Sequence, residues 1–578
     1  MKTLADFRRI WGIDFEFQEL NGHLPHVHCM VARDFHSGEL VRLFGDELTP
    51  GHIPFDLQDD DLVVVYYGSA EIKCFKTLSW HLPGHILDLF TEVSRMSSGM
   101  SLTHGKGLLG ALYAYGLEGI GALEKESMRE LAMTKTFFSS AEKTALLNYC
   151  QSDVDALRKL YQKMLSTIKL DYALLRGRFM KAAGIIEYNG IPIDMGVFTP
   201  LSGAWDKVKR ALIKRYDRHG IWQDGSFGIG RFQQFLERHQ ISWFFTEKGN
   251  IKTDDESFKT LENTHPEIGV IRELKRMLGG FNLRDIYHGP DGRNRCMLSA
   301  FRSKTGRNQP SNAHFIFGVS SWLRSLIKPT TGNSLAYIDW SQQEFGIAAA
   351  LSEDQSMIEA YLSGDPYLAF PKQAGAVPLN ATKLSHPVER AQFKQCILAV
   401  QYGMGVDSLA TVLNESTATA RRLLDQHKTT YRKFWEWSEN VINYALFHGY
   451  LHTTFDWRVN VVGEANTRSL ANFPMQANGA EMLRLACCLA TEQGIKVCAP
   501  VHDAVLIEAP TGSIHQAVND MQKAMEEASL AVIRKFPLRT DVKIINAPNR
   551  YVDEKRGPDM WNTVMEIIDL PECAISPS

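Results

Sequence analysis

The sequence predicts a multidomain protein of the α+β class. Its 578 residues exceed the roughly 250–300 residues beyond which one hydrophobic core usually divides. Apolar residues make up 44% of the chain, enough to fill several cores. Short apolar segments typical of strands, several with a carboxylate at or near one end, are interspersed with long helical stretches. We therefore expect several domains whose strands deliver acidic side chains.

The composition narrows the class of protein. The net charge is only −3, so the chain has no global signature of nucleic-acid binding, although the distribution of charge matters more than its sum. The nine cysteines lack the spacing of paired metal ligands. The first residues lack the apolar core of a signal peptide, and no run approaches the ~20 apolar residues of a membrane span. We expect a cytoplasmic protein with no membrane partner.

Two carboxylates share one face of the first predicted strand. Asp14 and Glu16 lie two residues apart in Ile13–Phe17, and side chains at that spacing point to the same side of a sheet. A second, buried strand is predicted over Asp61–Tyr67, and the helix that follows carries Glu71 in its first turn. These segments predict a sheet with several acidic groups close to one another.

A helix in the same region adds a tyrosine and another carboxylate. Tyr149 and Asp153 are four residues apart, so on a helix they face the same way. Each such pair is common on ordinary surfaces when taken alone. The ordered combination of acidic strand, acidic helix and Tyr-x3-Asp helix is more specific than any one of these pairs.

Two further predicted strands each deliver an aspartate. Ala336–Asp339 and Val497–Asp503 are both apolar segments that carry a carboxylate at or near one end. If Asp339 and Asp503 meet, they can hold a pair of divalent cations ~3.5–4 Å apart, the arrangement that stabilises phosphoryl transfer.

A cationic helix lies between these two strands in the sequence. Residues four apart drift by only 40° around a helix, so Arg390, Lys394, Leu398 and Tyr402 share one broad face. The two cations suit phosphates at one end of the helix, and the ring suits a base or sugar at the other. The combination predicts a two-metal nucleotidyl transferase.

These motifs, in this order, resemble those of the family A DNA polymerases, the group that includes the large fragment of bacterial DNA polymerase I. Further matches lie at Thr305–Arg307 and in Arg468-x3-Asn472-x-Pro474-x-Gln476. The resemblance covers most of residues 170–578. The segments that resemble the family's motifs A, B and C are Asp339–Glu344, Arg390-x3-Lys394-x7-Tyr402-Gly403 and Val501–Asp503.

The N-terminal third resembles the DEDD exonucleases of the tyrosine subtype, a 3′–5′ proofreading domain that precedes the polymerase in the same family. Two residues compete for the third carboxylate, Glu71 and Asp88. We favour Glu71, because the family commonly has a second, non-ligand aspartate after this motif and Asp88 fits that position. The residues that carry the resemblance are Asp14, Glu16, Glu71, Tyr149 and Asp153.

The resemblance implies an RNase H-like 3′–5′ exonuclease domain followed by a right-hand polymerase domain. We expect no separate 5′-nuclease. The expected divisions are 1–165 for the exonuclease, 166–294 for the thumb and connecting region, 295–349 for the first part of the palm, 350–449 for the fingers and 450–578 for the second part of the palm.

The resemblance also implies roles for individual residues. Asp339 and Asp503 would hold two Mg²⁺ (or Mn²⁺) ions, and Lys394 would protonate the departing pyrophosphate. In the exonuclease domain, a second pair of ions would be held by Asp14, Glu16, Glu71 and Asp153, while Tyr149 orients the attacking water. Residues expected to bind the nucleotide are Arg390, Lys394, Leu398, Tyr402, Glu344 and Tyr367. Residues expected to contact DNA are Arg307, Arg468, Asn472, Gln476 and His502.

Five departures from the family pattern bear on the origin of the chain. Ala504 replaces the glutamate of motif C, Trp340 replaces a tyrosine of motif A, and Tyr367 replaces a histidine often found near the triphosphate. Leu398 stands where the family has Phe or Tyr, and Glu481 stands where it has Asp. With the compact size, they indicate a phage-type branch. We interpret the chain as a monomeric replicative enzyme of a phage or mobile element that acts in the host cytoplasm.

Three functions compete at this stage. The first is a proofreading DNA polymerase that extends primer–template DNA with dNTPs. The second is a 3′–5′ exonuclease whose polymerase half only holds DNA, which Ala504 alone supports. The third is a single-subunit RNA polymerase. Glu344 disfavours it, because family A DNA polymerases use a glutamate there to crowd the sugar 2′ position.

Overall fold

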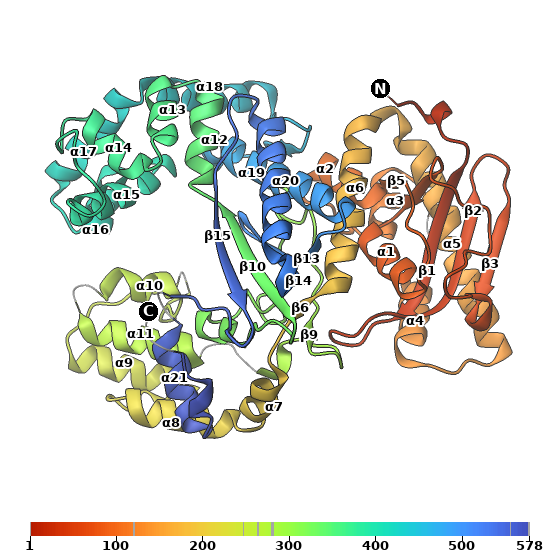
Figure 1. Ribbon diagram of the computed structural model, residues 1–578, viewed down its shortest axis with the longest axis horizontal. Helices are drawn as coiled ribbons and strands as arrows, with labels where there is room; N and C mark the ends of the chain where they lie inside the picture. Colours follow the sequence, from red (N-terminus) through yellow and green to blue (C-terminus); the bar gives the residue numbers. More distant parts are fainter. Residues whose placement is uncertain are drawn as a thin grey trace.

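Two separate sheets organise the chain (Figure 1). A five-stranded sheet lies in the N-terminal part, and a four-stranded sheet lies at the centre of the remainder, between two groups of helices. The computed structural model describes residues 2–118, 122–246, 248–262, 265–278, 283–554 and 557–575.

The N-terminal sheet is mixed and has the order β3-β2-β1-β4-β5. The first strand pairs antiparallel with the second and parallel with the fourth. This is the RNase H-like arrangement that the sequence predicted. The strands are β1 (Ile10–Gln18), β2 (His26–Asp34), β3 (Leu40–Phe44), β4 (Leu62–Val65) and β5 (His85–Asp88).

Helices cover both faces of this sheet. The fully buried run of β4 is apolar and rich in valine, as expected for a parallel strand covered on both sides. The long helix α5 (Ser140–Met164) begins at a capping box, in which Ser139 Oγ accepts from the Glu142 N–H and the Glu142 carboxylate accepts from the Ser139 N–H. The other helices of this domain are α1 (Gly68–Thr77), α2 (Leu89–Ser97), α3 (Leu108–Ala114) and α4 (Ala122–Thr134).

The central sheet is antiparallel throughout and has the order β13-β14-β10-β15. It lies where the resemblance expects the palm. Its strands are β10 (Asn333–Trp340), β13 (Lys496–Val501), β14 (Ala504–Pro510) and β15 (Thr540–Asn546).

Alternation along β10 decides which face each residue occupies. Ile338 and Trp340 are buried in the core formed with α19 (Thr467–Glu492) and α20 (Ile514–Ile533). Tyr337 packs on the opposite side, and Asp339 therefore points the same way as Tyr337.

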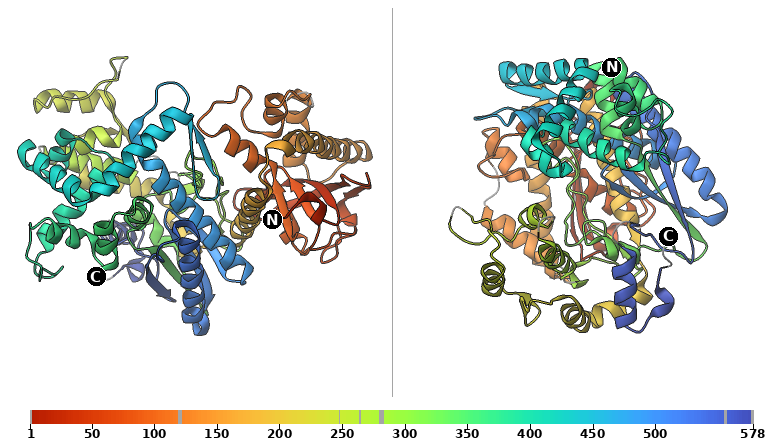
Figure 2. Two further views of the ribbon diagram at one scale, coloured as in Figure 1. Left: turned by 90° about the horizontal axis from the view of Figure 1, so that it is seen from above. Right: turned by 90° about the vertical axis from the view of Figure 1, so that its left-hand side faces the viewer.

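Two groups of helices lie on either side of this sheet (Figures 1 and 2). The group after β10 leads into the hairpin of β11 (Tyr450–His452) and β12 (Arg458–Asn460). That group contains α12 (Gln343–Ser352), α13 (Gln355–Leu362), α14 (Pro366–Gln373), α15 (Pro387–Gln401), α16 (Val406–Leu413), α17 (Thr417–Thr430) and α18 (Arg432–His448). The other group contains α7 (Met195–Gly203), α8 (Trp205–Tyr216), α9 (Ile229–Arg238), α10 (Asp255–Leu261) and α11 (Pro266–Leu278).

The last helix departs from the expected division of the chain. The segment 450–578 was expected to be palm, yet α21 (Pro558–Ile567) packs against α8. Trp561 is fully buried in the same core as Trp205. The end of the chain therefore contributes to the helical group that begins at α7, because an apolar helix face is buried where a partner surface exists.

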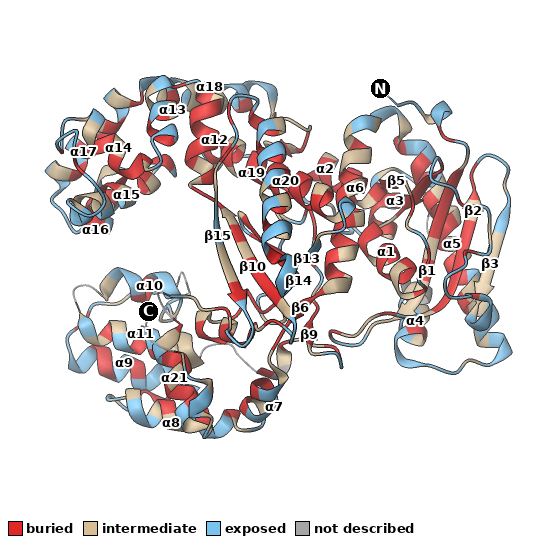
Figure 3. Ribbon diagram, in the orientation of Figure 1, coloured by how far each residue is buried: buried red, intermediate tan, exposed pale blue. Residues whose placement is uncertain are grey.

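One helix joins the two halves of the molecule. α6 (Leu170–Asn189) packs against α1 and β5 on one side and against α19 and β13 on the other, and its inward sides are largely buried (Figure 3). Gly177 permits this close approach, since a Cβ there would lie 1.9 Å from the carbonyl oxygen of Ile86. Within the described ranges, none of the helices combines the length and apolar character needed to span a lipid bilayer.

Gly177→Ala should destabilise the junction between the halves. The added methyl group meets backbone rather than a movable side chain, so we expect a loss of about 1–3 kcal/mol in unfolding free energy, measured by thermal and denaturant unfolding. The matched control is Gly203→Ala in α7, where a Cβ would have no neighbour within 4 Å. Equal stability of the two variants would contradict the close-packed junction.

Candidate active sites

Strand register brings Asp339 and Asp503 together. Asp339 ends the part of β10 that pairs with β14, and it lies directly opposite Ala504. The Trp340 N–H donates to the carbonyl oxygen of Asp503 at 3.1 Å. Directly opposed residues of an antiparallel pair have Cα atoms about 4.5–5.5 Å apart. The two aspartates that the sequence singled out are thus neighbours, with Asp339 on β10 and Asp503 in the turn that precedes β14.

A third carboxylate, which the sequence analysis missed, flanks Asp339 on its other side. Asp541 lies opposite Asp339 on β15, and Ser341 Oγ donates to Asp541 Oδ2 at 2.6 Å. No local motif marks Asp541. Only the register between β10 and β15 reveals its position.

Burial and like charge make this cluster costly to ionise. Burial, followed by the charges of Asp503 and Asp541, raises the pKa of Asp339 to about 6. Burial also raises the pKa of Asp503. Carboxylate oxygens are the ligands that Mg²⁺ and Mn²⁺ prefer, and a bound cation would offset the repulsion. The residues present therefore fit a divalent-cation site.

A cavity of about 300 Å³ adjoins Asp503. It brings together residues of the turn between β13 and β14, of α12 and of α14 and α15. Four of the six residues predicted to bind a nucleotide line it. The lining residues are Arg307, Gln342, Gln343, Glu344, Phe345, Tyr367, Leu398, Tyr402, His502 and Asp503.

Glu344 is held at the wall of this cavity through both carboxylate oxygens. Arg307 Nη2 donates to Oε1 at 2.8 Å, and the Tyr402 hydroxyl donates to Oε2. Gln401 Nε2 also donates to the Glu344 carbonyl at 3.0 Å. A side chain with both oxygens bonded has little rotational freedom, so Glu344 presents a fixed surface to the cavity.

The two remaining predicted nucleotide ligands, both cations of α15, lie around one aromatic ring. Arg390 and Lys394 lie 5.8 and 5.4 Å from the centre of the Tyr367 ring, within range of cation–π attraction. Arg390 also forms an ion pair with Asp365. Tyr367, which stands where the family often has histidine, thus holds both cations beside the cavity.

The predicted DNA-contacting residues divide between two places. Arg307, Gln476 and His502 line a larger groove of about 600 Å³, which shares Arg307 and His502 with the smaller cavity. Asn472 donates to the Tyr402 carbonyl at 3.3 Å, and the Arg468 side chain lies beside Gly403. These last two support the end of α15.

The groove also contains an arginine that the sequence analysis missed. Arg484 lines it and donates to the Gly306 carbonyl at 2.6 Å. The signal available in the sequence was its position on the same helix, eight residues after Gln476.

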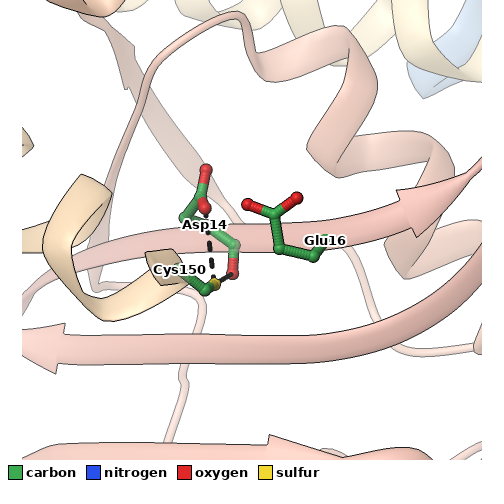
Figure 4. Close-up of side chains that lie close together, drawn as sticks. All are labelled: Asp14, Glu16 and Cys150. Carbon is green, nitrogen blue, oxygen red and sulfur yellow. Dashed lines mark hydrogen bonds between the residues drawn. The ribbon is translucent and has the colours of Figure 1, made fainter. Parts of the chain in front are cut away.

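In the N-terminal domain, Asp14 and Glu16 project from β1 toward one side, with Cys150 of α5 next to Asp14 (Figure 4). The Cys150 thiol donates to the Asp14 carbonyl at 3.3 Å and to Asp14 Oδ2 at 3.4 Å. A ligand atom from each of these three residues lies within 4.8 Å of the others.

The helix α5 adds Tyr149 and Asp153 to this cluster, as their spacing predicted. Both are buried, and the charge of Asp153 contributes to raising the pKa of Asp14. A cation that the sequence analysis missed is also present. Lys125 Nζ of α4 lies 3.1 and 3.3 Å from the Asp153 carboxylate oxygens and 5.9 Å from the centre of the Tyr149 ring.

The structure distinguishes the two candidates for the third carboxylate. Asp88 caps α2 by accepting from the Thr91 N–H at 3.0 Å, and it also accepts from the Gly68 N–H at 2.6 Å. Its oxygens are therefore occupied in joining two helices. Glu71 is buried, and the charges of Asp14 and Asp153 help to raise its pKa. Glu71 thus lies closer to the cluster and stays the proposed ligand.

These acidic groups are under strong electrostatic strain. Burial and the charge of Asp153 raise the pKa of Asp14 to about 8, and burial raises the pKa values of Glu16 and Glu71. Among the described residues, the buried Glu71 Oε2 has no hydrogen-bond partner. An orphaned oxygen beside buried carboxylates fits a cation ligand.

Comparison with known proteins assigns the chain to a family. The model of DNA polymerase family A matches residues 235–547. This chain belongs to that family. The predicted family and its multidomain fold are thereby confirmed.

Relatives of this family A polymerase include bacterial enzymes. DNA polymerase I of Aquifex aeolicus is 24% identical over 467 residues, which cover 73% of this chain and 78% of the relative. Thermostable DNA polymerase I of Thermus caldophilus is 26% identical over 319 residues, which cover 51% of this chain but only 37% of that enzyme.

A solved structure has the same fold. The polymerase domain of Pol1 from M. smegmatis, in complex with DNA primer-template and dNTP, superimposes with a TM-score of 0.70 at 17% identity. The superposition covers 93% of this polymerase and 95% of that chain.

The raised pKa of Asp14 predicts how stability depends on pH. A folded-state pKa of about 8 against 3.8 when unfolded means that the native state binds the proton more tightly. Without divalent cations, stability should therefore fall as pH rises from about 4 to 8. The side chain of Asp14→Asn cannot ionise. At pH 8 we therefore expect its free energy of unfolding to exceed that of the parent by at most about 5 kcal/mol.

The measurement is denaturant unfolding in EDTA at pH 5 and pH 8. Asp59→Asn, at an exposed aspartate of the same domain, is the control and should follow the parent. The same pH dependence in the parent and in Asp14→Asn would contradict the buried, protonated Asp14.

Proposed function

We propose that this chain is a template-directed DNA polymerase that adds dNTPs to a primer 3′ end and also has a 3′–5′ proofreading exonuclease. The observation that carries the polymerase half is the closeness of Asp339 and Asp503, with a cavity beside Asp503 that is walled by Glu344 and Tyr402. The cluster of carboxylates around Asp14 carries the exonuclease half.

At the polymerase site, each part of the nucleotide has a matching surface. Arg390 and Lys394 bind the triphosphate, and Lys394 donates a proton to the departing pyrophosphate. Glu344, immobilised by Arg307 and Tyr402, crowds the sugar 2′ position and excludes ribonucleotides. Divalent cations, Mg²⁺ or Mn²⁺, held by the paired aspartates would activate the primer 3′-hydroxyl and offset phosphate charge.

The groove beside this site suits a primer–template duplex. Its cationic and amide side chains can contact phosphates and the minor-groove side of the last base pairs, where shape rather than sequence is checked. The residues proposed to contact DNA are Arg307, Arg468, Asn472, Gln476 and His502.

At the exonuclease site, the buried carboxylates would hold a second pair of cations. Asp14, Glu16, Glu71 and Asp153 are the proposed ligands, and Tyr149 orients the attacking water. Selectivity for errors follows because a mismatched end melts and enters the site at lower cost.

The enzyme is proposed to come from a phage or mobile element. The departures at Ala504, Trp340 and Tyr367 support a phage-type branch, in which the enzyme replicates the DNA of a phage or mobile element as a monomer in the host cytoplasm.

A second function is supported by Ala504 alone: an exonuclease whose polymerase half holds DNA without extending it. A primer-extension assay separates the two.

We expect primer extension with dNTPs, no extension with rNTPs, and shortening of the primer without nucleotides. Asp339→Ala should abolish extension and spare shortening, because it removes a ligand from the palm alone. Asp14→Ala should do the reverse. The assay follows a 5′-labelled primer on gels, and loss of both activities in either variant would contradict two separate sites.

Asp541 is proposed to support the metal site in place of the missing motif C glutamate. Ala504 and Asp541 flank Asp339 on opposite neighbouring strands, so a carboxylate absent on one side is present on the other. Asp541→Asn should raise the Mg²⁺ concentration for half-maximal extension by about tenfold. Asp541→Glu should retain most of the affinity, and Ala504→Glu added to Asp541→Asn should restore part of it.

The control for this series is Asp425→Asn, an exposed aspartate on α17. It removes the same charge far from the central sheet and should leave the Mg²⁺ requirement unchanged. An unchanged requirement in Asp541→Asn as well would remove Asp541 from the site.

A further inference from the structure

A cleft of about 390 Å³ opens beside the exonuclease carboxylates. Glu16 and Tyr149 of the acidic cluster line it. Tyr287 and Met297, which belong to the polymerase half of the chain, line it as well. The cleft therefore connects the acidic cluster with a surface that the exonuclease fold does not itself supply.

The helix α4 presents two cations to this region. Lys125 and Arg129 are four residues apart, so they share one face of α4 and are separated by about 6 Å along its axis. Lys125 Nζ reaches the carboxylate of Asp153. Arg129 lines the cleft and is exposed, and within the described parts of the chain it forms no ion pair.

Other cations near the cleft already have partners. Lys73 pairs with Glu19, with Nζ 2.6 Å from Oε2, and Arg295 pairs with Asp291 at 2.6 Å. Their charge is compensated inside the protein. Arg129 differs from both, since its guanidinium pairs with no carboxylate of the described residues and is available to an external anion.

The cleft also has flat and apolar surfaces. The Tyr287 ring stacks on His314, with centroids 3.8 Å apart and planes 10° apart. Met297 is half exposed at 51%, as is Leu20 at 53%. Aromatic and apolar groups together with cations are the combination by which proteins bind single-stranded nucleic acid, because bases stack on the rings and phosphates are held by the cations.

We propose that Arg129, which lines this cleft, and Lys125, one helical turn away on α4, bind successive phosphates of a single-stranded DNA 3′ end, with Lys125 at the phosphate next to the carboxylates. The inference rests on the proposed exonuclease function. Lys125 Nζ lies 3.1 Å from an Asp153 carboxylate oxygen and 5.9 Å from the centre of the Tyr149 ring, and a phosphate that reaches the acidic cluster would need its negative charge offset there. Arg129 would hold the next phosphate of the DNA strand.

A simpler role for Lys125 is that of an internal counter-ion that reduces repulsion among the carboxylates. The two roles differ in their dependence on salt. A phosphate contact releases counter-ions from DNA, so each contact steepens the dependence of log affinity on log salt by about 0.7 for a single strand. An internal ion pair affects stability and leaves that slope unchanged.

The test is digestion of a 5′-labelled single-stranded oligonucleotide in Mg²⁺ across a salt series. Lys125→Gln and Arg129→Gln should each raise KM about tenfold at low salt and reduce the salt slope by about 0.7. Lys125→Arg should keep the parental slope. Lys159→Gln, at an exposed lysine of α5 in the same domain, is the charge-matched control and should behave as the parent.

Two further measurements keep the outcomes distinct. Binding of an oligonucleotide with a fluorescent base analogue at its 3′ end, measured in EDTA, should show the same changes in slope without any cleavage. Primer extension should persist in all variants and verifies that they fold. If the parent digests DNA and the slopes of Lys125→Gln and Arg129→Gln equal that of Lys159→Gln, the inference is wrong. If the parent digests no DNA, the proposed exonuclease function itself fails.

Discussion

The structure of the polymerase half depends on the register of one strand with its two neighbours. β10 places Asp339 opposite Ala504 on one side and opposite Asp541 on the other, with Asp503 in the adjoining turn. This concentrates negative charge where burial already opposes ionisation, and the pKa of Asp339 rises to about 6. The repulsion among these carboxylates would be offset by a bound cation. The surrounding helices bring the cationic and aromatic groups of the proposed nucleotide site to the same region.

The N-terminal domain also gathers several carboxylates that repel one another, but it does so with a different geometry. Its acidic side chains come from alternate positions of one strand and from two helices, and burial raises the pKa of Asp14 to about 8. Here the protein supplies a cation of its own, Lys125. The palm cluster instead has its cations on α15, gathered around Tyr367 at the far side of the cavity.

Local spacing predicted much of both sites. Asp14 and Glu16 on one face of a strand, Tyr149 and Asp153 on one side of a helix, and the cationic face of α15 all follow from fixed backbone periods. The packing of α21 against α8, away from the central sheet, could not be predicted in this way. An apolar helix face shows that burial is required, whereas the choice of partner depends on surfaces far away in the sequence.

The sequence alone determined the family, the strands of the two sheets and most of the acidic and basic residues proposed for the two sites, because motif order and short-range spacing are properties of the chain. The tertiary structure decided three matters that depend on contacts between distant segments. Strand register placed Asp541 beside Asp339, helix packing brought Lys125 to Asp153, and the hydrogen bonds of Asp88 with Gly68 and Thr91 left Glu71 as the proposed member of the acidic cluster around Asp14. Long-range geometry of this kind has no local signature, since it arises only when separate elements pack together.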